Sequence, residues 1–269
     1  MVKKLFKHEY LAWLRVLPVL YIITFGVAAM HRLIQLFEND SVYYNIISGS
    51  AIFMYVVMLM VCLAAPTVFS IARFYKNMFT GEGYLTLTLP VKPSDHLWVK
   101  ALTVVSFDIL SLLACFISFM IISAGDVFSE VCKAAWYLLE AVFEKLGGHF
   151  VAYGAEVCLL LLVASFLSCL LYYTCICIGQ LFRKNRILAA VGVYFGFYLV
   201  TQVFSTVLGI VIVILESAGA FAAVEAFADA HPYAFLHILL CGSAALYAAL
   251  ATVYFVICHH IIRKKLNLE

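Results

Sequence analysis

Residues 73–100 read RFYKNMFTGEGYLTLTLPVKPSDHLWVK and form a polar island between two long apolar stretches of the chain. The island contains the closely spaced glycines Gly81 and Gly83, and two prolines precede Ser94. Glycine and proline end helices, whereas serine is a favoured N-cap residue. The pattern predicts that the helix before the island continues through Lys76, that a short folded element follows, and that Ser94 caps the next helix.

Composition places the rest of the chain in the membrane-protein class. Hydrophobic residues make up 66% of the 269 residues and charged residues 12%, against about 25% charged residues in soluble domains. A spanning helix needs about 20 apolar residues, and six runs of this kind occur, at approximately residues 16–37, 45–72, 101–125, 151–181, 187–215 and 234–262. The sequence therefore predicts an all-α integral membrane protein with six transmembrane helices in a single domain, residues 1–269.

Lysine and arginine predict the orientation of the spans. If the N-terminus is cytoplasmic, the cytoplasmic side receives most of the basic residues, and the outer side receives only Arg32, Lys133 and Lys145. This distribution obeys the positive-inside rule for short connections. Both termini are therefore expected in the cytoplasm, and the chain is expected to be a multi-pass protein of the cell membrane.

Two polar segments have the periodicity of amphipathic surface helices. Near the N-terminus, Lys3, Lys4 and Lys7 alternate with apolar residues, which predicts a helix on the inner leaflet; a basic flank that only sets the topology is the alternative. On the outer side, residues 126–150 alternate apolar and charged positions in the same way, and Gly147 is expected to end that helix. Both segments are predicted to lie along a membrane surface.

The segment RFYKNMFTGEGYLTLTLPV, residues 73–91, resembles the intracellular loop between the second and third spans of ABC-type export permeases of the second subfamily, notably those of Gram-positive bacteria. Span count and loop order agree with that family along the whole chain. The resemblance implies the membrane-spanning subunit of an ATP-driven exporter, which forms half of a translocation path. It also implies that residues 73–100 are a cytoplasmic coupling element, seated in a groove of a separate ATPase subunit.

The resemblance implies specific partners and contact residues. The partners are a separate ABC ATPase subunit, a second permease copy or paralogue, and membrane lipids; nucleic acid is not expected. No Gly-x-x-x-x-Gly-Lys-Ser/Thr phosphate loop occurs in the chain. ATP and Mg²⁺ are therefore expected in the partner, with no cofactor in this chain and no enzymatic activity of its own. The expected ATPase-coupling residues are Arg73, Lys76, Glu82, Tyr84, Leu85, Leu89 and Pro90.

Residues within the spans are candidates for the translocation path. The resemblance implies that the second and fifth spans line the interface between two half-permeases, so Tyr194, Tyr198, Thr201 and Gln202 are candidate path-lining residues. Gly192 and Gly196 form a Gly-x-x-x-Gly pattern that permits close helix packing.

Asp108 lies in the third span, where a charge costs about 2.5–3.5 kcal/mol at the membrane centre. Either it faces a cavity or a cation, or it reaches toward Lys100 at the inner interface; the sequence leaves both open. Glu156, near the outer end of the fourth span, is expected to reach water. An alternative function, an ion- or proton-coupled carrier, would use Asp108 and Glu156 in a relay. An intramembrane enzyme is a weaker alternative, because no dyad of catalytic residues is recognisable.

Cysteine and histidine spacing predicts neither disulfides nor a metal site. Most of the nine cysteines fall inside apolar runs, where a thiol behaves as a small hydrophobic group, and the close pair Cys175 and Cys177 lacks the two-residue gap of redox and zinc motifs. The histidine pair His231 and His237 has no acidic or cysteine partner at ligand spacing in the sequence. The chemical identity of a transported substrate does not follow from these patterns.

Overall fold

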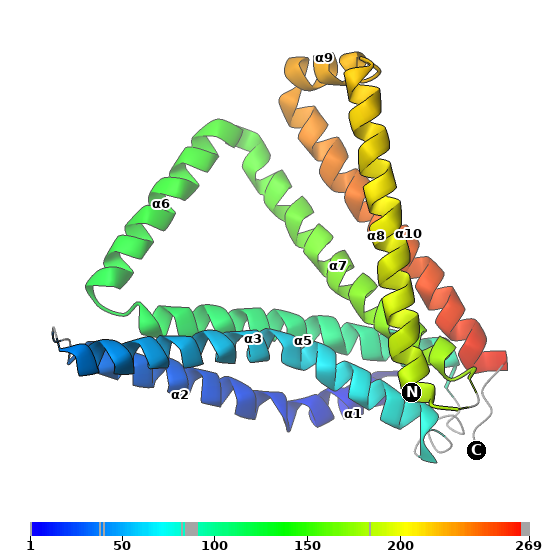
Figure 1. Ribbon diagram of the computed structural model, residues 1–269, viewed down its shortest axis with the longest axis horizontal. Helices are drawn as coiled ribbons and strands as arrows, with labels where there is room; N and C mark the ends of the chain where they lie inside the picture. Colours follow the sequence, from blue (N-terminus) through cyan, green and yellow to red (C-terminus); the bar gives the residue numbers. More distant parts are fainter. Residues whose placement is uncertain are drawn as a thin grey trace. The chain divides into compact units, whose positions relative to one another are not determined.

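The computed structural model describes residues 2–37, 39, 41–81, 83, 91–182 and 184–264, and the regular structure of these residues is entirely helical (Figure 1). The helices are α1 (Val2–Leu14), α2 (Leu17–Gln35), α3 (Val42–Phe79), α5 (Pro93–Ile122), α6 (Asp126–Leu146), η1 (Gly147–His149), α7 (Phe150–Gly179), α8 (Arg186–Ser217), α9 (Ala222–Ala230) and α10 (Pro232–Lys264). Six helical stretches, containing α2, α3, α5, α7, α8 and α10, are long and apolar enough to cross a membrane. The all-helical, multi-pass architecture predicted from the sequence is therefore confirmed. The cytoplasmic placement of the termini stays a prediction.

The chain divides into two compact units. Unit 1 combines Met1–Phe74 with Leu89–Lys145, and unit 2 combines Tyr75–Thr88 with Leu146–Glu269. This division reflects packing alone, so the expectation of one membrane domain stays a prediction.

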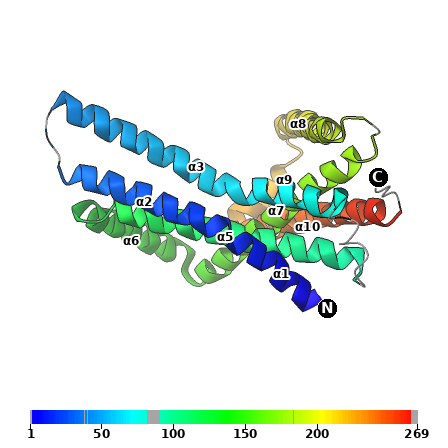
Figure 2. The same cartoon turned by 90° about the horizontal axis from the view of Figure 1, so that it is seen from below.

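Unit 1 is organised by a buried stripe on α5, which contacts α1 and α2. The views in Figures 1 and 2 agree that α2 runs alongside α5. Members of the stripe recur every three or four residues, as expected for one face of a helix, and many of them are small or carry hydroxyl groups. They are Leu97, Lys100, Ala101, Thr103, Val104, Phe107, Ser111, Ala114 and Ser118. Small and hydroxyl-bearing residues let neighbouring membrane helices approach closely.

Unit 2 is built on the packing of α7 against α8 and α10. On α10, the small residues Ala244, Ala251 and Cys258 are buried at seven-residue spacing. At the end of α7, Gly179 allows the backbones of α7 and α8 to meet, because a Cβ at this position would lie 2.7 Å from the backbone nitrogen of Ala190. Close backbone contact therefore holds this unit together.

Three local predictions can be compared with the structure. The helix before the polar island does continue through Lys76, since α3 ends at Phe79. The predicted cap at Ser94 is wrong: α5 begins at Pro93 with Lys92 as its N-cap residue, and no side chain caps it. Proline suits the first helical position because its fixed φ is helical and its missing N–H is not needed there. On the outer segment, α6 ends at Leu146 and Gly147 has φ +51°, so the predicted stop is confirmed.

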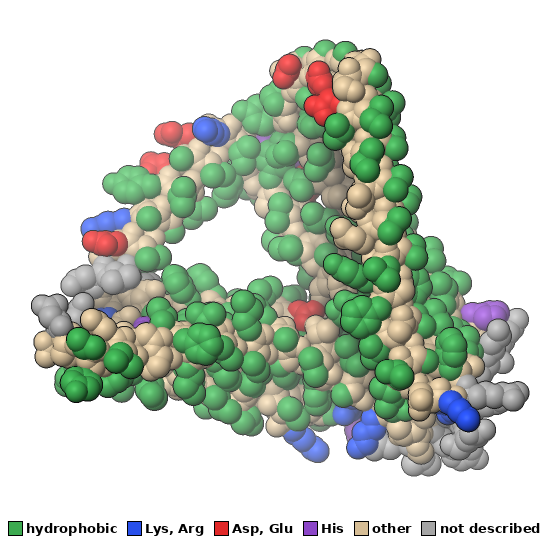
Figure 3. All heavy atoms as spheres, viewed as in Figure 1, with side chains coloured by type: hydrophobic (Ala, Val, Ile, Leu, Met, Phe, Trp, Pro, Cys, Tyr) green, Lys and Arg blue, Asp and Glu red, His purple; other side chains and the backbone are tan. Residues whose placement is uncertain are grey.

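Apolar side chains cover the visible faces of the long helices, whereas α6 carries interspersed acidic and basic groups (Figure 3). All of α8 is described, and none of its residues is buried. An apolar helix with no buried residue needs lipid or another protein around it. The structure therefore leaves the surface of α8 available to one of these.

Candidate functional site

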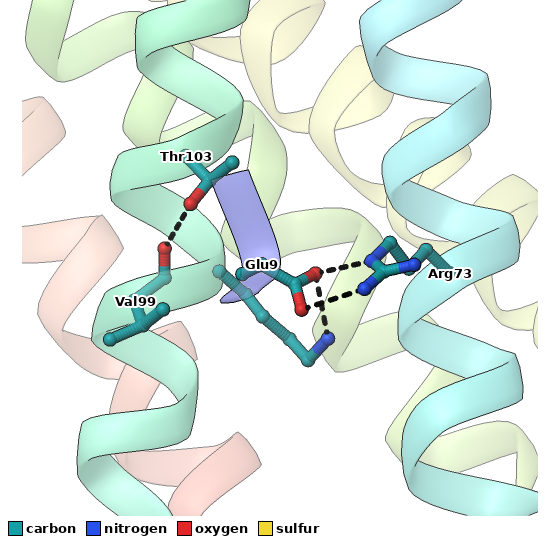
Figure 4. Close-up of polar contacts among 5 residues, drawn as sticks. Glu9, Arg73, Val99 and Thr103 are labelled. Atoms are coloured by element: carbon teal, nitrogen blue, oxygen red, sulfur yellow. Dashed lines mark hydrogen bonds and ion pairs between the residues drawn. The ribbon is translucent and has the colours of Figure 1, made fainter. Parts of the chain in front are cut away.

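A buried cluster of charged residues lies in unit 1, where Glu9 on α1 meets two basic residues. Arg73 on α3 donates from Nε to Glu9 Oε1 at 2.7 Å and from Nη2 to Oε2 at 3.2 Å. Lys100 on α5 donates from Nζ to Glu9 Oε1 at 3.1 Å. Figure 4 shows the Glu9 carboxylate facing the Arg73 side chain, with Thr103 bonded to the Val99 carbonyl of its own helix nearby. We call Glu9, Arg73 and Lys100 the Glu9 cluster.

The geometry of the Glu9 cluster makes it a strong clamp between three helices. The side chains of Glu9 and Lys100 are only 8% and 5% exposed, and Arg73 is 21% exposed. A bidentate arginine–carboxylate pair is short, directional and stronger than a neutral hydrogen bond. Removing one partner of a buried pair costs about 3–5 kcal/mol, because the other charge stays buried without compensation. The cluster therefore ties α1 to the two helices that flank the polar island.

Aromatic packing and hydroxyl pairs extend this attachment. Trp13, one turn after Glu9 on α1, is 1% exposed; its ring lies 5.0 Å from that of Phe69 and 5.0 Å from that of Phe107. Further along α5, the hydroxyl groups of Tyr21 and Ser111 are 2.9 Å apart. Those of Tyr55 and Ser118 are 3.1 Å apart.

The predicted ATPase-coupling residues have different surroundings. Arg73 belongs to the Glu9 cluster, a partner that the sequence did not indicate. Lys76 is exposed in the last turn of α3, and its carbonyl accepts a hydrogen bond from the Thr80 hydroxyl at 2.5 Å. Five predicted contact residues lie outside the described residues: Glu82, Tyr84, Leu85, Leu89 and Pro90. Their role stays a prediction.

The predicted path-lining residues fall on α8 and α5. Tyr194 stacks on Tyr172 of α7, with ring centroids 5.6 Å apart, whereas Tyr198 is 56% exposed. Thr201 and Gln202 are exposed too. The predicted packing residues Gly192 and Gly196 face open space, where an added Cβ would meet nothing within 4 Å. Among the described residues of unit 2, this glycine face therefore has no packing partner.

Asp108 follows the buried Phe107 on α5 and is half-buried. Lys100, the basic residue that the sequence offered as its neighbour, bonds Glu9 through its ammonium group.

A second polar site, which the sequence reasoning missed, joins α7 to α10 in unit 2. His237 Nδ1 lies 2.7 Å from Glu156 Oε1, and His237 Nε2 lies 3.1 Å from His149 Nδ1. The carboxylate favours a proton on His237 Nδ1, because only an N–H can donate to it. Tyr153 stacks on His237 at 4.2 Å and donates its hydroxyl to the Tyr233 carbonyl at 2.8 Å. We call Glu156, His237 and His149 the histidine chain.

The sequence feature that could have indicated the histidine chain is the helical spacing of its residues. His149, the N-cap residue of α7, is followed on that helix by Tyr153 and Glu156 at intervals of four and three residues, which places the three on one face. On α10, Tyr233 and His237 are four residues apart. Glu156 lies 81 residues from His237 in the sequence, far outside the ligand spacings that the sequence pattern could reveal. No group of three or more metal-ligating side chains suited to a metal ion occurs among the described residues.

In comparisons with protein-family models, curated proteins and solved structures, nothing matches this chain. The function is therefore argued from its residues and their geometry.

Proposed function

We propose that this chain is the membrane-spanning subunit of an ATP-driven ABC exporter, which forms half of a translocation path and couples to a separate ATPase subunit through residues 73–100. The observation that supports this most is the Glu9 cluster. Arg73 and Lys100 stand at the two ends of that segment, and one buried carboxylate holds both. A displacement of the segment would thus be passed to α1, α3 and α5 together.

Helix length supports the same proposal. The 38 residues of α3 correspond to about 57 Å at about 1.5 Å per residue, whereas about 30 Å suffices to cross the hydrocarbon core. A helix of this length can begin in the membrane and still project beyond its surface. By moving as a rigid body, α3 could transmit a displacement from a peripheral ATPase into the bilayer.

The exposed face of α8 supports a second permease copy. Six spans supply half of a path in the proposed assembly, and the glycine face with Gly192 and Gly196 is open. Glycines on a membrane helix permit a second helix to approach without a side chain between them. We place the contact between two copies, or between this chain and a paralogue, on α8.

Site-specific photo-cross-linking in living cells tests the coupling role. A photoreactive amino acid is placed at Tyr84, and a matched one at Tyr137 on α6, which is 70% exposed. The proposal predicts that Tyr84 captures a protein with an ATPase phosphate loop and that Tyr137 does not. Capture of that ATPase from neither position, or equally from both, contradicts the proposed interface.

An ion- or proton-coupled carrier is the second candidate, and the histidine chain favours it. Glu156, His237 and His149 are protonatable groups in continuous hydrogen-bond contact, as a proton relay requires. Uptake or efflux by reconstituted protein, driven by a pH gradient without ATP, distinguishes the candidates. If the chain is a proton-coupled carrier, Glu156→Gln should abolish this transport. If it is an exporter subunit, neither the unchanged chain nor the variant should transport in response to a pH gradient.

A further inference from the structure

The rotation of α1 about its own axis is fixed by its buried face. Glu9 and Trp13, four residues apart and therefore on one face of the helix, are 6% and 1% exposed. The first is bonded to Arg73 and Lys100, and the second packs between Phe69 and Phe107. The remaining faces of α1 are consequently held toward the surroundings of unit 1.

A shallow groove of about 510 Å³ lies on these outer faces. Its lining residues all belong to α1: Lys3, Lys4, Phe6, Lys7, Tyr10 and Leu11. The lysines are exposed, while Phe6 stacks on Tyr10 at 5.8 Å and Tyr10 packs against the buried Phe107 at 4.9 Å. The groove thus combines a supported apolar floor with flexible ammonium groups, whose hydrocarbon stems can also cover apolar surface.

The charge of the groove has no counterpart within α1. Glu9 is the only acidic residue of this helix, and it is buried against Arg73 and Lys100, a cluster whose formal charges sum to +1. Across the described part of the chain, no carboxylate forms an ion pair with Lys3, Lys4 or Lys7. An occupant that complements the groove must therefore bring negative charge and an apolar portion.

The position of the groove selects the kind of occupant. α1 ends at Leu14 and α2 begins at Leu17, so the groove is continuous in sequence with a helix that can cross a membrane. The first turns of α2 expose apolar side chains, including Val19 at 56% and Ile22 at 68%. A membrane lipid reaches such a place from the bilayer itself.

We propose that the α1 groove is a binding site for an anionic phospholipid, whose phosphate lies against Lys3, Lys4 and Lys7 and whose acyl chain lies along Phe6, Tyr10 and Leu11. Basic residues near an anionic membrane surface each strengthen binding about fivefold. Three of them predict a preference for anionic over zwitterionic lipid on the order of 100-fold. The site is argued from the packing of α1 within unit 1, so it does not rest on the proposed exporter function.

Native mass spectrometry of the full-length chain measures this preference directly. Phosphatidylglycerol and phosphatidylcholine with identical acyl chains compete for the purified protein. The variant Lys3→Gln/Lys4→Gln/Lys7→Gln is expected to lose most of the preference, and Lys3→Arg/Lys4→Arg/Lys7→Arg to keep it. The control Lys133→Gln/Lys145→Gln, which removes charges from α6, is expected to behave like the unchanged chain.

Two outcomes overturn the proposal. The first is an unchanged preference in the glutamine variant. The second is displacement of phosphatidylglycerol by a similar concentration of inorganic phosphate, which would identify a site for the free anion rather than for a lipid. If the triple variant inserts poorly into membranes, each single Lys→Gln variant is measured instead, and a loss of about fivefold is expected from each.

Discussion

Helices α5 and α8 have similar lengths and the same hydropathy, yet their surroundings are opposite. α5 has 30 residues, α8 has 32, and the most apolar window of each has a mean hydropathy of 2.3. α5 nevertheless buries a long stripe that includes Lys100, Ser111 and Ser118, whereas α8 buries no residue. Hydropathy identifies both as candidate spans and does not distinguish a helix that buries one face within its unit from a helix that buries none.

The residues that make the difference are small or polar. Lipid tails are as apolar as leucine, so burial of apolar surface does not by itself bring helices together in a membrane. The contacts of unit 1 accordingly use an ion pair and hydroxyl groups, as at Glu9 and at Tyr55 with Ser118. On α8, the hydroxyl of Thr201 instead bonds the carbonyl of Phe197 in its own helix. Substitutions on the two helices should therefore have very different effects.

The largest effect is expected at the Glu9 cluster. Glu9→Ala leaves Arg73 and Lys100 without their shared carboxylate, which should lower the free energy of unfolding by about 3–5 kcal/mol. Thermal unfolding in detergent measures the loss. Glu216→Ala, which removes an exposed carboxylate near the end of α8, should leave the midpoint almost unchanged. Equal midpoints for the two variants would show that the cluster does not hold unit 1 together.

A smaller loss of stability is expected from a substitution at the contact between α7 and α8. Gly179→Ala places a Cβ 2.6 Å from the Cβ of Ala190, and such overpacking costs about 1–3 kcal/mol. Gly192→Ala is the matched control on α8, because its added methyl group meets nothing within 4 Å. Unfolding midpoints in the same detergent compare the two. The account predicts a decrease only for Gly179→Ala, and equal stability of both variants would exclude the close contact.

Loss of one hydroxyl pair is expected to lower the free energy of unfolding by less than either of these changes. Ser118→Ala removes the partner of the Tyr55 hydroxyl, which is 3.1 Å away in a buried position, and a typical hydrogen bond contributes about 1 kcal/mol. Thr201→Ala on α8 should have a smaller effect, because its hydroxyl bonds only its own helix. Unfolding in a denaturing detergent series resolves a difference of this size. A larger loss from Thr201→Ala would reverse the ranking of the two helices.

The smallest effect on the chain itself is expected at the open glycine face. Gly196→Leu adds a side chain where no neighbour lies within 4 Å, so the stability of the isolated chain should change by less than about 0.5 kcal/mol. If α8 forms the contact between two copies, the same variant should decrease cross-linking between copies through cysteines introduced along α8, which has none of its own. A cross-linking yield that does not decrease would assign this face to lipid.

The sequence predicts the spans well and the contacts between them poorly, for a physical reason. A run of about 20 apolar residues determines a membrane helix locally, so α2, α3, α5, α7, α8 and α10 could all be located. Likewise, Gly147 stops α6 through its own backbone conformation. By contrast, Glu9 lies 64 residues from Arg73 and 91 from Lys100, and a single sequence contains no information about such pairing.

The histidine chain illustrates the same limit. Glu156 and His237 are separated by 81 residues, so a search for neighbouring metal-ligating or catalytic residues could not connect them. Their positions could still be assigned to the faces of two helices. Which faces meet depends on tertiary packing.

The most direct test of coupling between residues 73–100 and a separate ATPase subunit is the ATPase activity that co-purifies with the chain. The full-length protein is isolated from its native membranes with its partners, reconstituted into lipid, and assayed for ATPase activity. The account predicts activity that is lost in Glu82→Lys/Tyr84→Ala and retained in the matched surface variant Glu130→Lys/Tyr137→Ala on α6. Hydrolysis that is absent from the unchanged preparation, or unaffected by the change at residues 82 and 84, would contradict it.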